Sequence, residues 1–252
     1  MEWRERSGVR WLEADLGGGR VAFSTRLGGV SEPPFDSLNL GALTDDDAEA
    51  VTENRHRLAS ALGFEPDQVA YARQAHGTRL IEHPTEFRGS FRSVGVQKEP
   101  RNEPPEADGY VLREPGTAAL VFTADCLPVA VSGPKGMAML HAGWRGLAGG
   151  ILAAGVEAVE ATSAAIGPGI GPCCYEVGEE VLDAFSGLGE GVAEGRMLDL
   201  AEVARRQLAW AGVERVESAG LCTNCEAELF FSHRRDAGRT GRQGGIAWIE
   251  GD

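Results

Sequence analysis

Two apolar stretches in the middle of the chain, residues 118–132 and 136–146, most constrain its fold. The first, AALVFTADCLPVAVS, predicts two short buried strands that are interrupted at Ala124, Asp125 and Cys126. The second, GMAMLHAGWRG, predicts another strand, which ends at His141 and turns at glycines. Cys126 and His141 are therefore expected at strand ends.

Helical patterns lie on both sides of these strands. Residues 48–62 have apolar positions on one face, a cap among Asp45 to Asp47 and a stop at Gly63. Further helices are predicted through residues 147–159, after the Gly/Pro loop that precedes Cys173, and from an Asp199 cap through Leu208 to Gly212. Strands are predicted at residues 20–26, near Val216 and over the final IAWI.

The chain shows no internal repeat and no break in composition that would divide it. We therefore predict one α/β domain of the α+β type over residues 1–252, with mixed β-sheets flanked by helices. Residues 85–106 have mixed charge, several prolines and little apolar content. This composition predicts a mobile surface loop.

Charge and cysteine content exclude several classes of protein. The formal charge of −14, from 38 acidic and 24 basic residues, opposes binding to nucleic acid. No apolar run is long enough for a membrane span, and the N-terminal residues lack the apolar core of a secretion signal. The five cysteines form an odd, irregular set, which is typical of a reducing compartment. We expect a soluble, cytoplasmic protein whose thiols are free or bound to metal.

His76, Cys126 and His141 are the candidate metal ligands. His76 in QAHGT and His141 in LHAGWRG lie next to turns that contain glycine, and Cys126 lies between them in ADCLP. Three imidazole and thiolate ligands leave the fourth position of a zinc ion open, as in catalytic rather than structural zinc sites. Spacing alone leaves a purely structural role open for each histidine.

Ten motifs in order make the chain resemble a known family over nearly its whole length. They are STRLGGVS, QAHG, ADGYVL, TADCLPV, HAGWRG, IGPGIGPCCYEVG, LDL, GLCT, FFSHRRD and GRQGGIAWI. These strings resemble the YfiH family of bacterial proteins, named polyphenol oxidases or laccase-domain proteins and later purine nucleoside phosphorylases. The resemblance implies that His76, Cys126 and His141 bind zinc.

The resemblance also implies an activity: phosphorolysis of adenosine, inosine and S-methyl-5'-thioadenosine, together with deamination of adenosine. Purine nucleosides and inorganic phosphate would then be the partners. Zinc lowers the pKa of a coordinated water, which suits attack at C6 of a purine. Arginine suits bidentate contacts to phosphate. Arg145 in HAGWRG is therefore a candidate catalytic residue, and Arg26, Arg234 and Arg235 are candidate substrate-binding residues.

Other residues in these motifs have more than one interpretation. Asp125 orients a histidine, accepts a proton, or caps the turn that follows it. Cys173 and Cys174 are interpreted as buried loop residues rather than ligands. Cys222 and Cys225 form a lone CxxC pair, which is a weak signal for zinc; a structural role is favoured and a redox role stays open. His233 stands where the family pattern has tyrosine, so a role carried by a phenol there is in doubt.

Three other readings of the site stay open. Two histidines and a cysteine also suit copper, as in a laccase-like polyphenol oxidase, although five histidines without a His-x-His pair are too few for a multicopper cluster. Alternatively, Cys126 is the nucleophile of a Cys-His hydrolase with His141 as its base. In the third alternative, the protein is not an enzyme and a zinc ion there only holds loops together.

Overall fold

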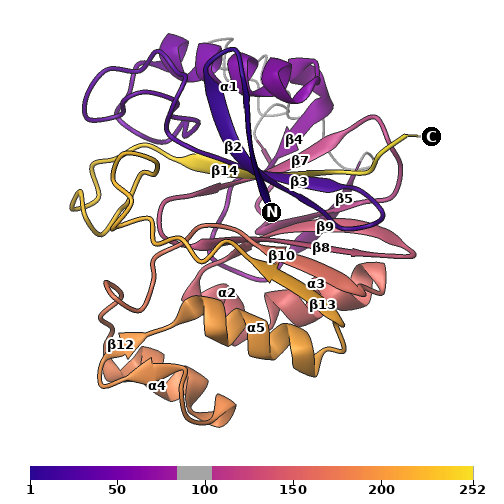
Figure 1. Ribbon diagram of the computed structural model, residues 1–252, viewed down its shortest axis with the longest axis vertical. Coiled ribbons are helices and arrows are strands. Elements are labelled where there is room, and N and C mark those ends of the chain that lie inside the picture. The colour runs from indigo at the N-terminus through magenta and orange to yellow at the C-terminus, as the bar shows by residue number, and fades with distance from the viewer. Residues whose placement is uncertain (84–103, 252) are drawn as a thin grey trace.

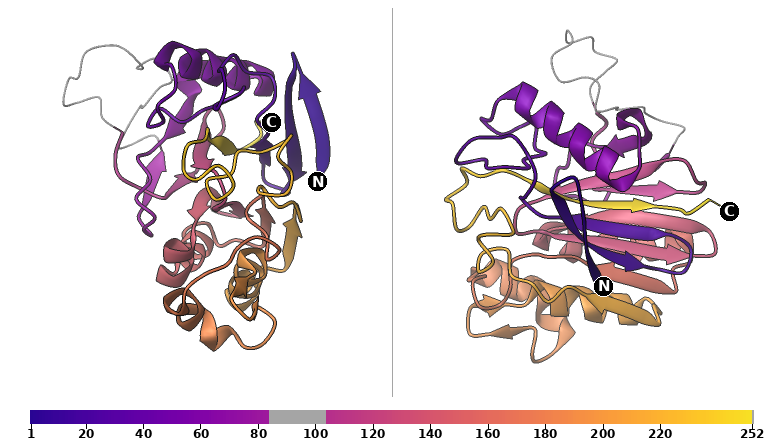
Figure 2. Two further views of the ribbon diagram at one scale, coloured as in Figure 1. Left: turned by 90° about the vertical axis from the view of Figure 1, so that its left-hand side faces the viewer. Right: turned by 45° about the horizontal axis from the view of Figure 1, so that its top comes forward.

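Two six-stranded β-sheets stack face to face, and helices cover their outer faces. The computed structural model describes residues 1–83 and 104–251. Figure 1 shows the layers from top to bottom as helix α1, the first sheet, the second sheet, and helices α2, α3 and α5. Figure 2 shows the same order from two other directions. The predicted fold class, mixed sheets flanked by helices in a single domain, is confirmed.

The first sheet joins the two ends of the chain. Its order is β1-β2-β3-β14-β7-β4, and only the β4–β7 pair is parallel. Its strands are Glu2–Arg6, Val9–Asp15, Arg20–Ser24, Gln243–Trp248, Ala118–Thr123 and Val69–Tyr71 in that order, and α1 is Ala48–Leu62. The last strand lies between β3 and β7, so residues more than 200 positions apart are hydrogen-bonded neighbours.

The second sheet carries most of the helices. Its order is β13-β10-β8-β9-β6-β5, with parallel pairs at its two edges. Its strands are Arg215–Ser218, Ser163–Ile166, Leu127–Gly133, Gly136–Ala142, Gly109–Leu112 and Leu80–His83 in that order. The helices below it are α2 (Trp144–Gly149), α3 (Ile151–Val159), α4 (Glu179–Phe185) and α5 (Leu200–Trp210), with a small hairpin of β11 (Ala193–Glu194) and β12 (Met197–Leu198).

Three apolar cores separate the four layers, and strand alternation distributes residues among them. In β9, Met137 and Met139 pack between the two sheets, whereas Ala138 and Leu140 pack toward the helices. Both sets are fully buried. Side chains of a strand point alternately to opposite faces, so a sheet covered on both faces needs apolar residues at nearly every position. This explains the two apolar stretches in the middle of the sequence.

The first predicted helix is confirmed at both ends. The Asp47 carboxylate accepts hydrogen bonds from the backbone N–H groups of Glu49 and Ala50. Gly63 ends the helix in the left-handed conformation, at φ 86°. A cap of this kind is worth about 1 kcal/mol because it satisfies N–H groups that have no partner within the helix.

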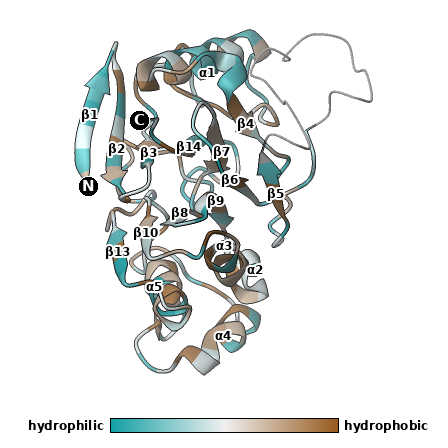
Figure 3. Cartoon of the chain, turned by 90° about the vertical axis from the view of Figure 1, so that its right-hand side faces the viewer, coloured by the Kyte–Doolittle hydropathy of each residue, from teal (hydrophilic) through white to brown (hydrophobic). Residues whose placement is uncertain are grey.

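Two details of the sequence prediction are wrong. The helix expected through residues 147–159 is divided into α2 and α3 at Gly150, which has φ 90°. The N-terminal hairpin of β1 and β2 was not anticipated. All five residues of β1, EWRER, are exposed, and the strand is coloured hydrophilic in Figure 3. A charged edge strand lacks the apolar alternation that identifies strands in a sequence, although its charges discourage pairing with other chains.

The predicted mobile loop, residues 85–106, falls almost entirely outside the described residues. At its end, Glu106 forms an isolated parallel bridge with Arg73. Of the helices in the described ranges 1–83 and 104–251, none is both long and apolar enough to cross a membrane.

Candidate metal centre

Cys126 lies where the chain crosses from one sheet to the other. Strand β7 belongs to the first sheet and β8 to the second, and only Ala124, Asp125 and Cys126 connect them. Asp125 takes up this sharp turn with φ 94°, in the left-handed region. The interruption that the sequence shows at these three residues is therefore a change of sheet.

His141 lies beside Cys126 because β8 and β9 are antiparallel. Leu127 pairs with Ala142, and Pro128 pairs with His141, so the start of β8 meets the end of β9. The position expected for both residues, at strand ends, is confirmed. The His141 side chain is buried, whereas Cys126 is half-buried.

His76 reaches the same place from the loop between β4 and β5. Its backbone is left-handed, with φ 59°, which is uncommon for a residue other than glycine. Its side chain is exposed, and its ring lies edge to face with that of His141, with 4.8 Å between ring centroids. One side of the group is thus open to solvent.

The donor atoms of His76, Cys126 and His141 all lie within 4.8 Å of one another. Zinc–nitrogen and zinc–sulfur bonds of about 2.0–2.3 Å in a tetrahedron place ligand atoms about 3.3–3.8 Å apart. Two imidazoles and a thiolate are a donor set that zinc accepts, and small adjustments of the exposed His76 ring would complete the distances. The residues therefore fit a single zinc ion.

One buried carboxylate, Asp108, organises two of the three side chains. It is 1% exposed and lies just before β6. One oxygen is 2.8 Å from His141 Nδ1 and accepts the His76 backbone N–H at 2.9 Å. The other accepts the N–H groups of Ala75 and Gly77 at 3.2 and 2.7 Å. A carboxylate at Nδ1 leaves His141 Nε2 for Cys126, the arrangement typical of metal-binding histidines.

Cys126 and His141 polarise each other. Burial alone would raise the pKa of the Cys126 thiol, but the charge of His141 and hydrogen bonds from His141 and His76 outweigh it and lower that pKa to about 6. Burial alone would lower the pKa of His141, but the Cys126 thiolate and the Asp108 carboxylate outweigh it and raise that pKa. The thiolate is the form that binds metals or attacks electrophiles.

Gly143 leaves the space that the group requires. A Cβ atom at this position would lie 2.9 Å from Cys126 Sγ and 3.2 Å from His76 Cδ2. Both distances are shorter than ordinary van der Waals contacts. The glycine after His141 in HAGWRG is thus required by close packing against the other two ligands, because its φ of −75° is open to any residue.

The candidate arginines fall into two groups. Arg145 is exposed, and its guanidinium lies 4.3 Å from the centroid of the Trp144 ring. Arg234 is also exposed and lies over the Tyr175 ring at 5.3 Å. Burial and the Cys126 thiolate raise the pKa of the Tyr175 hydroxyl to about 12. The positive charges of Arg234 and Arg145 lie close enough to offset part of this rise.

Arg26 and Arg235 each direct several N–H groups into the protein, whereas among the described residues the Arg234 guanidinium donates to the Glu176 carbonyl alone, at 3.0 Å. Arg26 donates to the carbonyls of Asp36 and Ala227 and forms an ion pair with the Asp36 carboxylate at 3.0 Å. Arg235 donates to the Asp236 carboxylate and to the carbonyls of Thr223 and Phe230. These contacts connect loops that are far apart in the sequence.

Three further residues near the centre were not singled out by the sequence reasoning: Asp108, Tyr175 and Arg242. Asp108 lies in ADGYVL, one of the family motifs, but nothing in its spacing connects it with His76 and His141. Arg242 is half-buried, and partial burial lowers the pKa of its guanidinium, although the negative charges of Cys126 and Asp125 partly offset this. An arginine near this thiolate is visible only once the chain is folded.

Asp125 connects loops and does not contact a histidine through the hydrogen bonds described. One of its oxygens accepts a hydrogen bond from the Thr223 hydroxyl and the other from the backbone N–H of Arg234, both at 2.7 Å. These bonds connect Asp125 to the loops at Thr223 and Arg234 and not to the turn that follows it, so its role in the site stays a prediction. His233 is exposed and its ring packs over Gly238.

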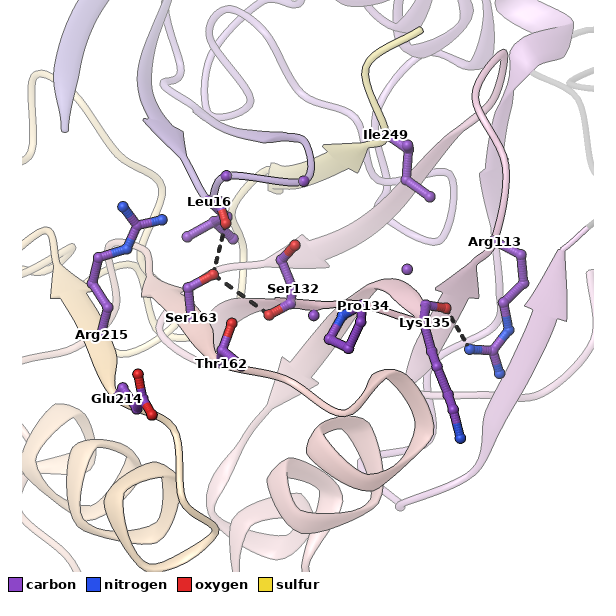
Figure 4. Close-up of a pocket in the computed structure, with 14 residues that line it drawn as sticks. Leu16, Arg113, Ser132, Pro134, Lys135, Thr162, Ser163, Glu214, Arg215 and Ile249 are labelled. Carbon is purple, nitrogen blue, oxygen red and sulfur yellow. Dashed lines mark hydrogen bonds between the residues drawn. The ribbon is translucent and has the colours of Figure 1, made fainter. Parts of the chain in front are cut away.

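The larger of two described cavities lies at the opposite end of the second sheet. It measures about 820 Å³ and includes the β8–β9 turn, whereas Cys126 and His141 lie at the other end of those strands. Figure 4 shows its cationic side chains, Arg113, Lys135 and Arg215, spread along its rim. Arg113 and Lys135 pair with Glu82 and Glu160, so the cavity offers no concentrated charge for an anion. The other cavity, of about 600 Å³, is lined by Arg26.

Similarity to known proteins identifies the family. Residues 20–250 match the family described as multi-copper polyphenol oxidoreductase laccase. The chain is 39% identical over 239 residues to purine nucleoside phosphorylase YfiH of Escherichia coli, a match that covers 90% of this chain and 92% of that protein. The chain belongs to the YfiH family.

Other YfiH family members agree with this assignment. The chain is 41% identical to a purine nucleoside phosphorylase of Deinococcus radiodurans, over 88% of this chain and 85% of that one. The crystal structure of YlmD from Geobacillus stearothermophilus superposes with a TM-score of 0.86 at 34% identity, covering 98% of each chain. The hypothetical protein YfiH of Bacillus licheniformis gives a TM-score of 0.85 at 32% identity, covering 98% of this chain and 99% of that one.

The family description and the cluster both indicate metal binding by this YfiH family member. The description refers to several copper ions. Among the side chains described here, the group that contains histidine has two of them, His76 and His141, with one cysteine. A single mononuclear centre is what this donor set can hold.

Proposed function

We propose that this YfiH family member is a zinc-dependent purine nucleoside phosphorylase that acts on adenosine, inosine and S-methyl-5'-thioadenosine and also deaminates adenosine. The observation that carries the proposal is the mixed group of His76, Cys126 and His141, with His76 exposed and His141 buried. Three such donors leave one coordination position for a substrate group, unlike a structural site.

The names of the relatives support the reaction class. Those from Escherichia coli and Deinococcus radiodurans are called purine nucleoside phosphorylases, and the chain covers most of the length of each. Their names do not specify a nucleoside, a metal or deamination, which are our proposals. A reducing, cytoplasmic location is part of the proposal, and the odd, irregular set of five cysteines in the sequence supports it.

His76, Cys126 and His141 would hold the zinc ion, which when bound supplies Lewis-acid polarisation of a substrate oxygen or nitrogen. Asp108 keeps the His141 ring in one orientation and one tautomer through the 2.8 Å contact at Nδ1. It also holds the His76 loop through three backbone N–H groups. These residues therefore present a rigid centre to the substrate, as efficient catalysis requires.

Arg145 and Arg234 would hold the phosphate. Both are exposed, and both lie near Tyr175 beside the centre. Guanidinium groups bind phosphate oxygens in a bidentate manner and stabilise negative charge in the transition state. We also assign Arg26 and Arg235 to substrate binding. Because their N–H groups donate to neighbouring loops, they would act by positioning those loops.

A nucleoside panel tests the proposal directly. Purified, zinc-loaded protein is incubated with inosine, adenosine or S-methyl-5'-thioadenosine, with and without phosphate, and products are separated by chromatography. Inosine should give hypoxanthine and ribose 1-phosphate only when phosphate is present, and adenosine should give inosine without phosphate. Folded, zinc-loaded protein that converts none of them, or that oxidises phenols only with copper, would overturn it.

Arg145→Ala separates phosphate binding from the rest of the site. Removal of one bidentate contact to phosphate should raise the KM for phosphate by about 10-fold or more and leave zinc content unchanged. Arg113→Ala is the matched control, because Arg113 lies by the cavity at the opposite end of the second sheet. Equal KM values for phosphate in Arg145→Ala and the wild type would remove this arginine from the proposal.

A Cys-His hydrolase is the second candidate. Cys126 would be the nucleophile, His141 beside it the base, and Asp108 the carboxylate that orients His141. Reactivity of the thiol separates the two functions. A metal-bound thiolate resists alkylation until a chelator is added, whereas a free nucleophile reacts at once. Rapid labelling of Cys126 in freshly purified, zinc-loaded protein would favour the hydrolase.

A further inference from the structure

Four cysteines that the sequence presents as two unrelated pairs form one cluster in the structure. The Sγ atoms of Cys173, Cys174, Cys222 and Cys225 all lie within 4.8 Å of one another. Cys225 Sγ is 3.5 Å from the Sγ atoms of both Cys173 and Cys174. Cys173 is exposed, so its interpretation as a buried loop residue is wrong, and the CxxC pair is not alone.

Sheet topology explains why the two pairs converge. Strands β10 and β13 are parallel neighbours, with Ile166 opposite Ser218. Neighbouring parallel strands run in the same direction and end at the same end of the sheet, so the segments that follow them run side by side. An isolated parallel bridge between Gly169 and Cys222 continues the pairing beyond the strands. Cys173 and Cys225 each follow a few residues later.

We propose that Cys173, Cys174, Cys222 and Cys225 bind a second zinc ion in a closed, structural Cys₄ site. Four thiolates around one zinc, with bonds of about 2.3 Å, lie about 3.8 Å apart. The cluster already has nearly this spacing. Zinc coordinated by four protein ligands has no position left for a substrate, so this ion would stabilise the fold rather than take part in chemistry.

The polar groups around the cluster suit thiolates. The Gly171 backbone N–H points at Cys222 Sγ at 3.2 Å, and the backbone N–H groups of Asn224 and Cys225 also donate to this sulfur. The Asn224 side-chain amide lies 3.1 Å from Cys174 Sγ. Donors of this kind stabilise negative sulfur and fix ligand orientation around a metal.

Close packing at Gly171 indicates that the loop is shaped around the sulfurs. A Cβ atom there would lie 3.2 Å from Cys222 Cβ, 3.4 Å from Cys173 Sγ and 3.5 Å from Cys222 Sγ. All four cysteines are free thiols, and the sulfur–sulfur distances of 3.5 Å from Cys225 to Cys173 and Cys174 are far longer than the roughly 2.05 Å of a disulfide. The geometry thus favours a shared cation over two disulfides.

The Cys₄ site would fix two loops that lie beside the first metal centre. Cys174 precedes Tyr175, whose ring carries the Arg234 guanidinium. Cys222 precedes Thr223, whose hydroxyl donates to Asp125, the neighbour of Cys126. A second zinc ion would therefore fix both loops relative to the crossover that bears Cys126. This inference concerns a separate set of ligands and does not depend on the reaction at the first centre.

Metal analysis of single-ligand variants tests the proposal. Wild-type protein purified without chelators should contain about two zinc equivalents per chain, one in each kind of site. Cys126→Ser should keep the equivalent held by four cysteines, and Cys225→Ser should lose it. Cobalt loaded into Cys126→Ser should give the strong charge-transfer and d–d absorption of a tetrahedral tetrathiolate centre. Cobalt added to a double variant that combines Cys126→Ser with Cys225→Ser should not give this absorption.

Glu228→Ser is the matched control, since Glu228 is exposed on the same loop as Cys225 but is not a thiol. It should retain the metal content of the wild type. Retention of unchanged zinc by Cys225→Ser, or absence of any tetrathiolate cobalt spectrum from Cys126→Ser, would overturn the proposal. Thiols of the cluster found oxidised in pairs after anaerobic, reducing purification would also overturn it. The Cys126→Ser measurements decide the matter even if Cys225→Ser does not fold.

Discussion

The molecule contains two clusters of side chains that could each hold a metal ion, both at the same end of the second sheet, and they are built in opposite ways. The first combines two histidines with Cys126, and its ligands are oriented by the buried carboxylate of Asp108. The second consists of four cysteines, of which two are exposed, and backbone N–H groups donate to the Cys222 sulfur. They are joined through the hydrogen bond from Thr223 to Asp125.

This difference shows how the number of protein ligands distinguishes a catalytic metal site from a structural one. Three mixed donors leave a coordination position, and a buried carboxylate raises the basicity of a histidine ligand. Four thiolates complete a tetrahedron and leave nothing for a substrate. A chain with one cluster of each kind can stiffen the surroundings of a reactive centre without occupying it.

The largest effect is expected from removal of the thiol of the first cluster. Cys126→Ser should reduce phosphorolysis of inosine by more than about 10²-fold, because loss of a partner outside the ligand set already costs about 10- to 100-fold. Circular dichroism should show an intact fold and metal analysis one remaining equivalent. If this variant unfolds, the first cluster is structural as well, and the contrast between the two clusters is lost.

Asp108→Asn tests whether the carboxylate organises the first cluster alone. We expect a decrease of about 10- to 100-fold in zinc affinity and in activity, since the amide cannot serve His141 and three backbone N–H groups as a carboxylate does. Competition with a chelator measures the affinity. Glu106→Gln, on the surface two residues earlier, should behave as the wild type. Equal zinc affinity in both variants would contradict this role for Asp108.

Cys225→Ser should lower stability more than chemistry. An ion held at about 100 times its Kd stabilises the folded state by about 2.7 kcal/mol, and each kcal/mol shifts the Tm of a chain of this size by roughly 2–4 °C. We therefore expect a Tm lower by roughly 5–10 °C. Calorimetry with and without chelator measures it. A Tm equal to that of Glu228→Ser would show that the second cluster does not support the fold.

The smallest effects should come from two glycines that sit against the two clusters. Gly143→Ala places a methyl group 2.9 Å from Cys126 Sγ, and Gly171→Ala places one 3.2 Å from Cys222 Cβ. Each should weaken zinc at its own cluster by a few-fold and leave the other unchanged. Zinc titrations followed through each cluster separately provide the measurement. A change at both clusters from either substitution would mean that they act as one unit.

Local patterns in the sequence predicted those parts of the fold that local physics controls. Asp47 and Gly63 define α1 because a cap and a left-handed stop act within one turn of the chain. The apolar stretches around Cys126 predicted buried strands because burial requires apolar side chains wherever it occurs. The charged strand β1 has neither signal, and it was missed.

By itself, the sequence determined the strand ends that carry Cys126 and His141, the likeness to a family, and the exclusion of nucleic acid by charge. Tertiary structure alone decided that β7 and β8 lie in different sheets, that Asp108 reaches both His76 and His141, and that Cys173 and Cys225 meet. The physical reason is that these contacts arise from sheet pairing and from one buried charge. Neither leaves a fixed spacing along the chain.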